Sequence, residues 1–156
     1  MHLYLVQHGA AKSEAEDPQR GLTNEGRRAV EHVAEFLAPL GLEIHRIEHS
    51  DKLRARQTAE ILAARLRPIE GTKQVSGLAP NDDIGPVAAR LQTETKNLLL
   101  VGHLPFQSRL AARLLGVAGD RTVVQFQMGG VLRLDCDDAG NWVVRWYLVP
   151  ELLAKS

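Results

Sequence analysis

Residues 98–103 read Leu-Leu-Leu-Val-Gly-His, and this stretch is the best candidate for a buried strand in the chain. Four consecutive apolar residues are too few for a helix and are typical of a strand covered on both faces of a parallel sheet. The run ends in Gly102-His103, and Pro105 then opens a predicted helix that reaches about Leu115. A strand followed directly by a helix is the unit from which α/β folds are built.

The same pattern begins the chain, where the apolar run Leu3–Val6 predicts a strand that ends in Gln7-His8-Gly9. Thr23 is the predicted N-cap of a helix that runs to about Leu40, with Gly41 as its stop. The other predicted elements are an extended stretch at 42–49, a helix from Ser50 as N-cap to about Leu66, a strand at 74–78, a helix at 84–91, and strands at 123–127, 131–136 and 142–148.

Strands that alternate with helices and then give way to a hairpin, with residues 137–141 as its turn, indicate an α/β fold. We predict a three-layer α/β/α arrangement with a mostly parallel sheet and an antiparallel C-terminal hairpin at its edge. At 156 residues the chain is long enough for one hydrophobic core, so we expect a single domain over residues 1–156.

Composition narrows the classes of function. Lys plus Arg and Asp plus Glu each number 19, so no bulk charge draws the chain to nucleic acid or to a membrane. Cys136 is the single cysteine, which excludes an intrachain disulfide and fits a reducing compartment. The sequence shows neither a signal peptide nor an apolar run of the roughly 18 residues that a membrane span needs. We therefore expect a cytoplasmic protein.

Candidate functional residues follow three of the predicted strands. In an open α/β sheet, ligands bind beyond the carboxyl ends of the strands, and His8 and His103 each stand there beside a glycine. A third strand ends near Ser50, and the helix after it carries Arg54 in its first turn, where free amides favour an anion. Arg20 lies in the polar loop after the first strand, within reach of the same edge. Two imidazoles and two guanidiniums suit a phosphoryl group, because guanidinium forks match phosphate oxygens and an imidazole can attack phosphorus.

These residues fall in motifs that resemble those of the histidine phosphatase superfamily, which includes the cofactor-dependent phosphoglycerate mutases. That family carries Arg-His-Gly after its first strand, then Ser-Pro-x-x-Arg-Ala-x-Gln-Thr, and then a second histidine after an apolar strand. The corresponding segments here are Gln7-His8-Gly9, residues 50–58 reading Ser-Asp-Lys-Leu-Arg-Ala-Arg-Gln-Thr, and residues 101–105 reading Val-Gly-His-Leu-Pro. With Arg20-Gly21-Leu22-Thr23, the short chain is most similar to the SixA-type protein phosphohistidine phosphatases. The resemblance covers Leu3 to about Leu115.

The resemblance implies a role for each matching residue. His8 would attack phosphorus and carry a phosphohistidine intermediate that water then hydrolyses. Arg20 and Arg54 would bind the phosphoryl oxygens, His103 would donate a further hydrogen bond to them, and Gly9 would allow a close backbone approach. The resemblance implies a phosphohistidine phosphatase that needs no metal or organic cofactor. Its partner would be a phosphohistidine-bearing protein, such as a phosphotransfer domain.

Two positions depart from the family pattern. Gln7 replaces the family arginine, so its amide can bind phosphate by a hydrogen bond but brings no charge. Larger relatives place an acidic residue over the leaving group after the third strand, where this chain has Asp82 and Asp83. We interpret these as a helix cap, with a general acid as the alternative. A phosphoramidate tolerates a weak acid, because its leaving nitrogen can be protonated before the P–N bond breaks.

The sequence argues against two other catalytic chemistries and leaves two alternative functions open. His45-Arg46-Ile47-Glu48-His49 spells a zinc-peptidase pattern, but that pattern requires a helix and this stretch is predicted to be extended. A cysteine phosphatase would need an arginine where Trp142 stands. Two alternatives persist: a small-molecule phosphomonoesterase of the same fold, and a catalytically weak phosphohistidine-binding module, suggested by Gln7. The oligomeric state stays open, and a monomer is compatible with the sequence.

Overall fold

The computed structural model describes residues 1–118 and 121–153, which are built around one six-stranded sheet with the order β3-β2-β4-β1-β5-β6. The strands are β1 (His2–Gln7), β2 (Arg46–His49), β3 (Thr72–Gln74), β4 (Leu98–Gly102), β5 (Val131–Cys136) and β6 (Trp142–Leu148). The first four run parallel to one another, while β5 pairs antiparallel with both β1 and β6. The predicted α/β class, the mostly parallel sheet and the antiparallel C-terminal hairpin are confirmed.

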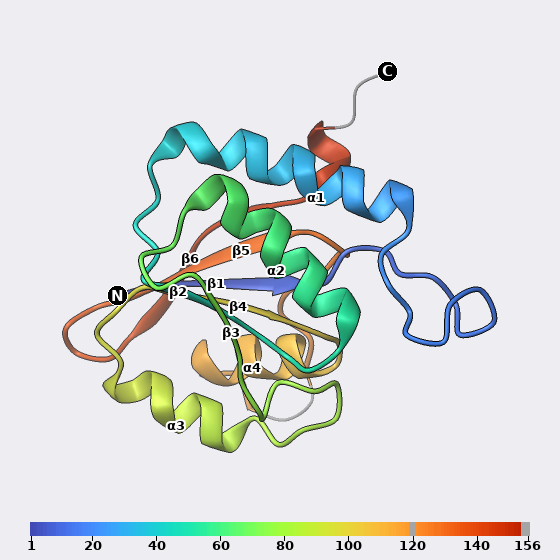
Figure 1. The fold of residues 1–156 in the computed structure, drawn as a ribbon. Helices are drawn as coiled ribbons and strands as arrows, with labels where there is room; N and C mark the ends of the chain where they lie inside the picture. Colours follow the sequence, from blue (N-terminus) through green and yellow to red (C-terminus); the bar gives the residue numbers. More distant parts are fainter. Residues whose placement is uncertain (119–120, 154–156) are drawn as a thin grey trace.

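Helices cover both faces of the sheet and make three layers (Figure 1). The longer pair, α1 (Asn24–Leu37) and α2 (Leu53–Leu66), lies on one face, and α3 (Gly85–Thr93) and α4 (Phe106–Leu114) lie on the other. Two 3₁₀ helices, η1 (Ala38–Leu40) and η2 (Pro150–Leu153), complete the elements. Within the described part of the chain, every helix is too short or too polar to cross a lipid bilayer.

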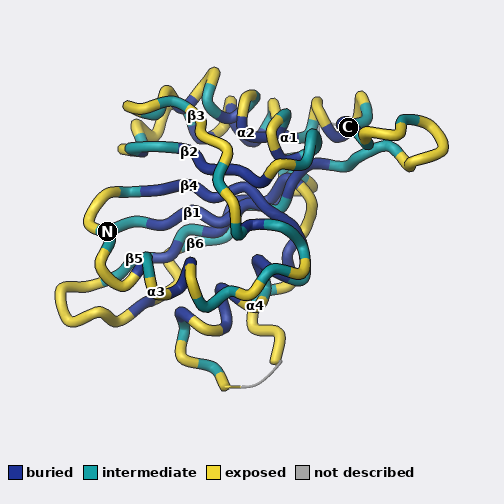
Figure 2. The backbone as a smooth tube through the Cα atoms, turned by 60° about the horizontal axis from the view of Figure 1, so that its bottom comes forward, coloured by how far each residue is buried: buried dark blue, intermediate teal, exposed yellow. Residues whose placement is uncertain are grey.

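Alternation along the central strands explains the two-sided core. Leu3 and Leu5 of β1 pack with α3 and α4, whereas Tyr4 and Val6 of the same strand pack with α1 and α2. All five residues of β4 are buried, as a central parallel strand requires (Figure 2). The two strands that are predicted from apolar runs are thus the ones covered by helices on both faces of the sheet.

Several predicted boundaries are wrong for identifiable reasons. The first helix is capped by Thr23, as predicted, but ends at Leu37 and tightens into η1, because Pro39 has no N–H for the helical ladder. Gly41 ends that turn with a φ of 61°, a left-handed conformation that favours glycine. The predicted strand at 123–127 does not form, and the backbone N–H of Gln127 donates to the hydroxyl of Tyr147 on β6 rather than to a neighbouring strand.

Three further boundaries also differ. The extended stretch predicted at 42–49 pairs in the sheet only over β2, and the strand predicted at 74–78 instead spans β3, with exposed side chains. The N-cap of α2 is Lys52 rather than Ser50, and Ser50 makes a different hydrogen bond, described below. The helices predicted at 84–91 and from Pro105 to Leu115 form with end shifts of one or two residues.

Candidate active site

The carboxyl ends of β1, β2 and β4 meet at one edge of the sheet because the three strands are parallel. The residue that follows each of them is His8, Ser50 and His103, respectively. In Figure 1 this edge lies on the right, where the arrow of β1 ends and the long loop to α1 begins. The structure therefore brings together the strand ends from which the sequence predicts the site.

His8 is held in a single orientation by the residue after it. Its Nδ1 lies 2.7 Å from the carbonyl oxygen of Gly9, and a carbonyl can only accept, so Nδ1 carries the proton. The other ring nitrogen, Nε2, is then unprotonated in the neutral ring and has a lone pair. His8 is buried, with 9% of its surface exposed. The geometry therefore provides an oriented imidazole nucleophile.

Burial also keeps His8 neutral. The pKa of His8 falls from 6.5 to about 4, chiefly because burial penalises the charged ring, with Arg54 and Arg20 adding repulsion and the hydrogen bond to Gly9 opposing the shift. At neutral pH the ring is thus in the form that can attack phosphorus.

His103 lies beside His8, with 5.0 Å between the ring centroids. Its Nε2 lies 2.6 Å from the hydroxyl oxygen of Ser50, which also accepts a hydrogen bond from the backbone of Lys52 at 3.3 Å. The Ser50 hydroxyl can donate to Nε2, and in the tautomer that this bond selects the proton of His103 lies on Nδ1. That Nδ1 is buried and has no partner among the described residues. Burial, followed by the effects of His8 and Arg54, lowers the pKa of His103 to about 3, so this ring is also neutral at pH 7.

Three arginines, Arg20, Arg54 and Arg56, line a cavity of about 490 Å³ at this edge. Arg54 comes from the first turn of α2 and Arg20 from the loop before α1. Burial lowers the pKa of Arg54, and the nearby charge of Arg20 lowers it further. The Nε of Arg54 is buried without a partner in the described chain. Glu14 and Asp51 also line the cavity, and its basic side chains outnumber them.

A tight loop positions Arg20. This residue has a φ of 52°, and its Nε donates to the carbonyl of Lys12 at 3.0 Å. Asp17 organises the loop, since its carboxylate accepts hydrogen bonds from the backbone N–H groups of Gln19 and Gly21. Those two bonds lower the pKa of Asp17, so the loop is held by an ionised carboxylate at neutral pH.

Gln57 and Thr58, the last two residues of the motif at 50–58, tie the loops to α2. The Thr58 hydroxyl accepts from the backbone of Gly9 at 2.9 Å and donates to the carbonyl of Arg54. Gln57 accepts from the backbone of Leu22 at 2.7 Å, two residues beyond Arg20. In the sequence, the signal for these two roles is their position three and four residues after Arg54 on the same predicted helix.

Gln7 and Gly9 flank the nucleophile. Gln7 is the last residue of β1, and its side-chain oxygen is buried without a partner among the described residues. Gly9 was expected to allow close approach to the ligand, but the structure gives a different reason for a glycine here. A Cβ at this position would lie 2.9 Å from Cγ2 of Val30, so α1 occupies the space.

The remaining candidates have structural partners. Asp82 accepts from the backbone of Ala79, outside α3, and Asp83 accepts from Gly85, the first residue of α3. The N-cap of α3 is Ile84, and its side chain makes no capping bond, so neither aspartate is the N-cap that the sequence predicts. In the zinc-like pattern, buried Glu48 is bound by Arg46 and by Arg90, whose Nη2 lies 2.6 Å from it. Among the described residues, no three His, Cys, Asp or Glu side chains are grouped to hold a metal ion.

Comparison with known proteins agrees with the fold and this site. Residues 3–78 match the family described as the histidine phosphatase superfamily (branch 1). The chain is 30% identical over 155 residues to the phosphohistidine phosphatase SixA of Escherichia coli (strain K12), covering 96% of this chain and 94% of SixA. A structure of SixA in complex with tungstate superposes with a TM-score of 0.87 at 29% identity. The superposition covers 99% of this chain and 100% of the SixA chain.

The chain belongs to the histidine phosphatase superfamily and is SixA-like over nearly its whole length. The family and the SixA likeness support a phosphatase. The alpha-ribazole phosphatase of Shigella flexneri has the same fold, with a TM-score of 0.75 and 96% coverage of both chains, but at 16% identity it informs the fold alone.

Proposed function

We propose that this protein hydrolyses phosphohistidine on a partner protein, with His8 as the nucleophile. The orientation of His8 carries the proposal: Nδ1 bonds to Gly9 and Nε2 keeps its lone pair. The 30% identity to a phosphohistidine phosphatase over 96% of the chain supports the substrate class. Tungstate is a tetrahedral oxyanion like phosphate, so its complex with SixA supports an oxyanion site in that relative.

The reaction proceeds in two steps. Nε2 of His8 attacks phosphorus, the P–N bond to the substrate histidine breaks, and that imidazole leaves with a proton. Water then attacks the phosphorylated His8, releasing inorganic phosphate and restoring the neutral ring. Both steps proceed with the side chains of this chain and require neither a metal nor an organic cofactor.

Four further side chains donate hydrogen bonds to the phosphoryl oxygens in this mechanism. Arg20 and Arg54 donate from the cavity wall, His103 donates through Nδ1, and Gln7 donates through its amide. Donors fixed before the reaction stabilise the charge that develops on the oxygens in the transition state. The carboxyl groups of Glu14 and Asp51 in the same cavity can supply the proton for the leaving nitrogen.

The partner is proposed to be a cytoplasmic protein, such as a phosphotransfer domain, and neither nucleic acid nor a membrane takes part. We propose a single catalytic domain over residues 1–156 that acts as a monomer.

A small-molecule phosphomonoesterase is the second candidate. The carboxyl groups of Glu14 and Asp51 favour it, since an alkoxide leaving group needs a positioned acid. A panel of phosphohistidine peptide, phosphorylated phosphotransfer protein and sugar phosphates separates the two. Turnover of any of them excludes a mere binding module.

Phosphoenzyme trapping tests the mechanism. Protein mixed with ³²P-phosphoramidate and denatured in alkali, where phosphohistidine survives, is expected to carry label that acid removes. His8→Ala should abolish the label, and His32→Ala, a partly exposed histidine of α1, should retain it. Full labelling of His8→Ala would contradict the mechanism.

A further inference from the structure

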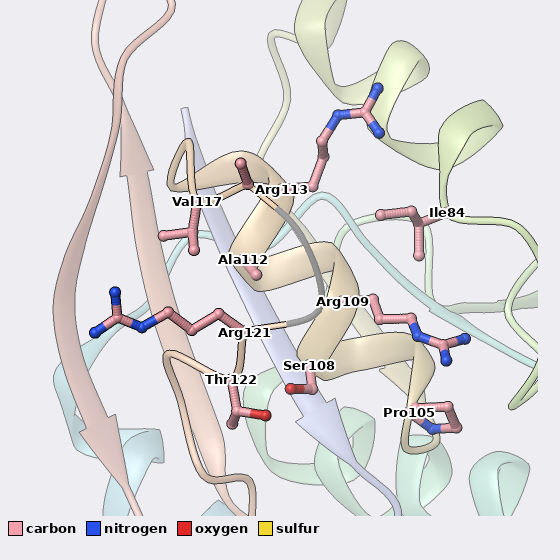
Figure 3. A pocket seen from close by; sticks show the side chains of 10 residues that line it. Ile84, Pro105, Ser108, Arg109, Ala112, Arg113, Val117, Arg121 and Thr122 are labelled. Atoms are coloured by element: carbon pink, nitrogen blue, oxygen red, sulfur yellow. The ribbon is translucent and has the colours of Figure 1, made fainter.

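A cavity of about 560 Å³ lies outside the arginine cavity of the active site. It follows α4 and is closed on one side by Ile84, just before α3, and on the other by residues after α4 (Figure 3). Ile84, Pro105, Ala112 and Val117 form its apolar part. We call this feature the α4 groove.

Arginines flank the α4 groove. Arg109 and Arg113 are one helical turn apart and lie on either side of Ile84, while Arg121 extends to the opposite side (Figure 3). All three are exposed, and the described lining of the groove includes no acidic residue. Nearby, the carboxylate of Asp82 accepts a hydrogen bond from the backbone of Ala79, and that of Asp83 accepts one from Gly85 at the start of α3.

The charge of the groove is a local excess. Acidic and basic residues balance at 19 each in the whole chain, so three arginines with no carboxylate in the described lining give this groove a positive local field that the net charge conceals. Among the described residues Arg109 and Arg113 form no ion pair, in contrast to Arg46 and Arg90, which both bind Glu48. Ion pairing within the described chain therefore does not account for Arg109 and Arg113.

The α4 groove starts at a residue close in sequence to His103. Pro105 lines it two residues after His103, and Leu104 between them is 38% exposed. With a rise of 1.5 Å per residue, Arg109 lies roughly 6 Å and Arg113 roughly 12 Å along the helix axis from Pro105. A ligand that contacts both arginines and also places a phosphoryl group on His8 must therefore extend well beyond one amino acid.

We propose that the α4 groove is the docking surface for the substrate protein, and that this partner presents an acidic surface with apolar side chains beside its phosphohistidine. The inference rests on the proposed function and adds the way in which the partner is recognised. The apolar part of the groove receives the partner's apolar side chains, and Arg109 and Arg113 pair with its carboxylates. Such pairs at the rim of an interface act mainly on the association rate and on its salt dependence.

Charge reversal tests the docking surface. The double variant Arg109→Glu/Arg113→Glu is compared with Arg65→Glu/Arg145→Glu, which makes the same change of charge at arginines that are 58% and 60% exposed outside the groove. The substrates are a phosphohistidine peptide of a few residues and an acidic phosphotransfer protein phosphorylated on its histidine, each measured at several salt concentrations.

For the groove variant we expect kcat/KM on the phosphoprotein to fall by roughly 10- to 100-fold, with a weaker salt dependence. Its kcat/KM on the peptide should stay within about twofold of wild type, and the control variant should match wild type on both substrates. Equal activity of both variants on the phosphoprotein would overturn the docking surface, as would an equal loss on peptide and protein. Wild-type protein that turns over no phosphohistidine substrate would instead overturn the proposed function on which the docking surface rests.

Discussion

Replacing Gln7 by arginine tests how charge at the end of β1 governs the reaction. Gln7 precedes the nucleophile, and its backbone carbonyl accepts a hydrogen bond from Gly129 at 2.8 Å. Its side chain carries no charge, and the side-chain oxygen is buried without a partner among the described residues. A guanidinium here would add a third cation to those of Arg20 and Arg54.

The gain can be estimated from the bond that the arginine would make. A hydrogen bond to a charged group is worth about 1.5–3 kcal/mol, so kcat/KM should rise by about 10- to 150-fold if the bond forms in the transition state. The gain at pH 7 cannot come from titration of His8, because the pKa of that ring is already about 4. It must come from binding the phosphoryl charge.

The pH dependence gives a second, independent readout. Neutral His8 is the reactive form, so the acidic limb of the wild-type profile should fall near pH 4. Another cation disfavours the protonated ring, lowers the pKa further and moves the limb to lower pH in Gln7→Arg. Without ligand, the added repulsion should lower Tm, and saturating phosphate should restore it.

The assay is a pH–rate profile from about pH 3 to 8 on a phosphohistidine peptide, corrected for its spontaneous hydrolysis. Gln7→Met, which has similar size but no hydrogen-bonding group, is the matched control and should be slower than wild type. If Gln7→Arg changes neither the rate nor the limb, the charge-deficit account is wrong and Gln7 merely fills space.

Three further results are expected. Truncating Arg54 to alanine should lower kcat/KM by about 10²-fold, and Arg54→Lys should recover little of it because a lysine lacks the fork; near-wild-type kinetics would place the phosphoryl site elsewhere. Ser50→Ala should lower the free energy of unfolding by about 1–3 kcal/mol in urea titrations and also lower kcat, since Nε2 of His103 loses its partner; unchanged values would exclude that hydrogen bond. Because burial lowers the pKa of His8, its contribution to stability is complete above pH 6.5 and is lost as pH falls toward 4. The loss is on the order of 3 kcal/mol. Urea midpoints that stay constant when the pH is lowered from 7 to 4.5 would contradict this burial.

The central strands and the site could be predicted from sequence for the same physical reason. A strand covered on both faces must be apolar throughout, so β1 and β4 stand out as runs, and the residues that follow them fall at one edge. Apolar pattern fails for residues 123–127, where the backbone of Gln127 bonds to the side chain of Tyr147 instead of to a neighbouring strand. It fails for β3 as well, whose side chains are exposed.

Hydrogen bonds between distant segments could not be read from the chain. Ser50 looks like a helix cap in sequence, and only the fold places it 2.6 Å from a histidine 53 residues away. Likewise, the reason for glycine at position 9 lies in the side chain of Val30 on another element. Local pattern predicts which residue types gather at the edge, whereas their partners depend on the assembled layers.

The hydrogen bonds between α2 and the loops determine how the site responds to substitutions elsewhere. Helix α2 supplies Arg54 and, through Gln57 and Thr58, holds the loops that carry Arg20 and Gly9. These parts are therefore coupled to the position of a single helix, and a remote core substitution that tilts α2 would misalign the phosphate donors together while leaving the chemistry of His8 intact. The groove along α4 lies on the opposite face of the sheet and shares none of these hydrogen bonds. If the α4 groove docks the partner as proposed, substitutions there can change its recognition without disturbing these hydrogen bonds.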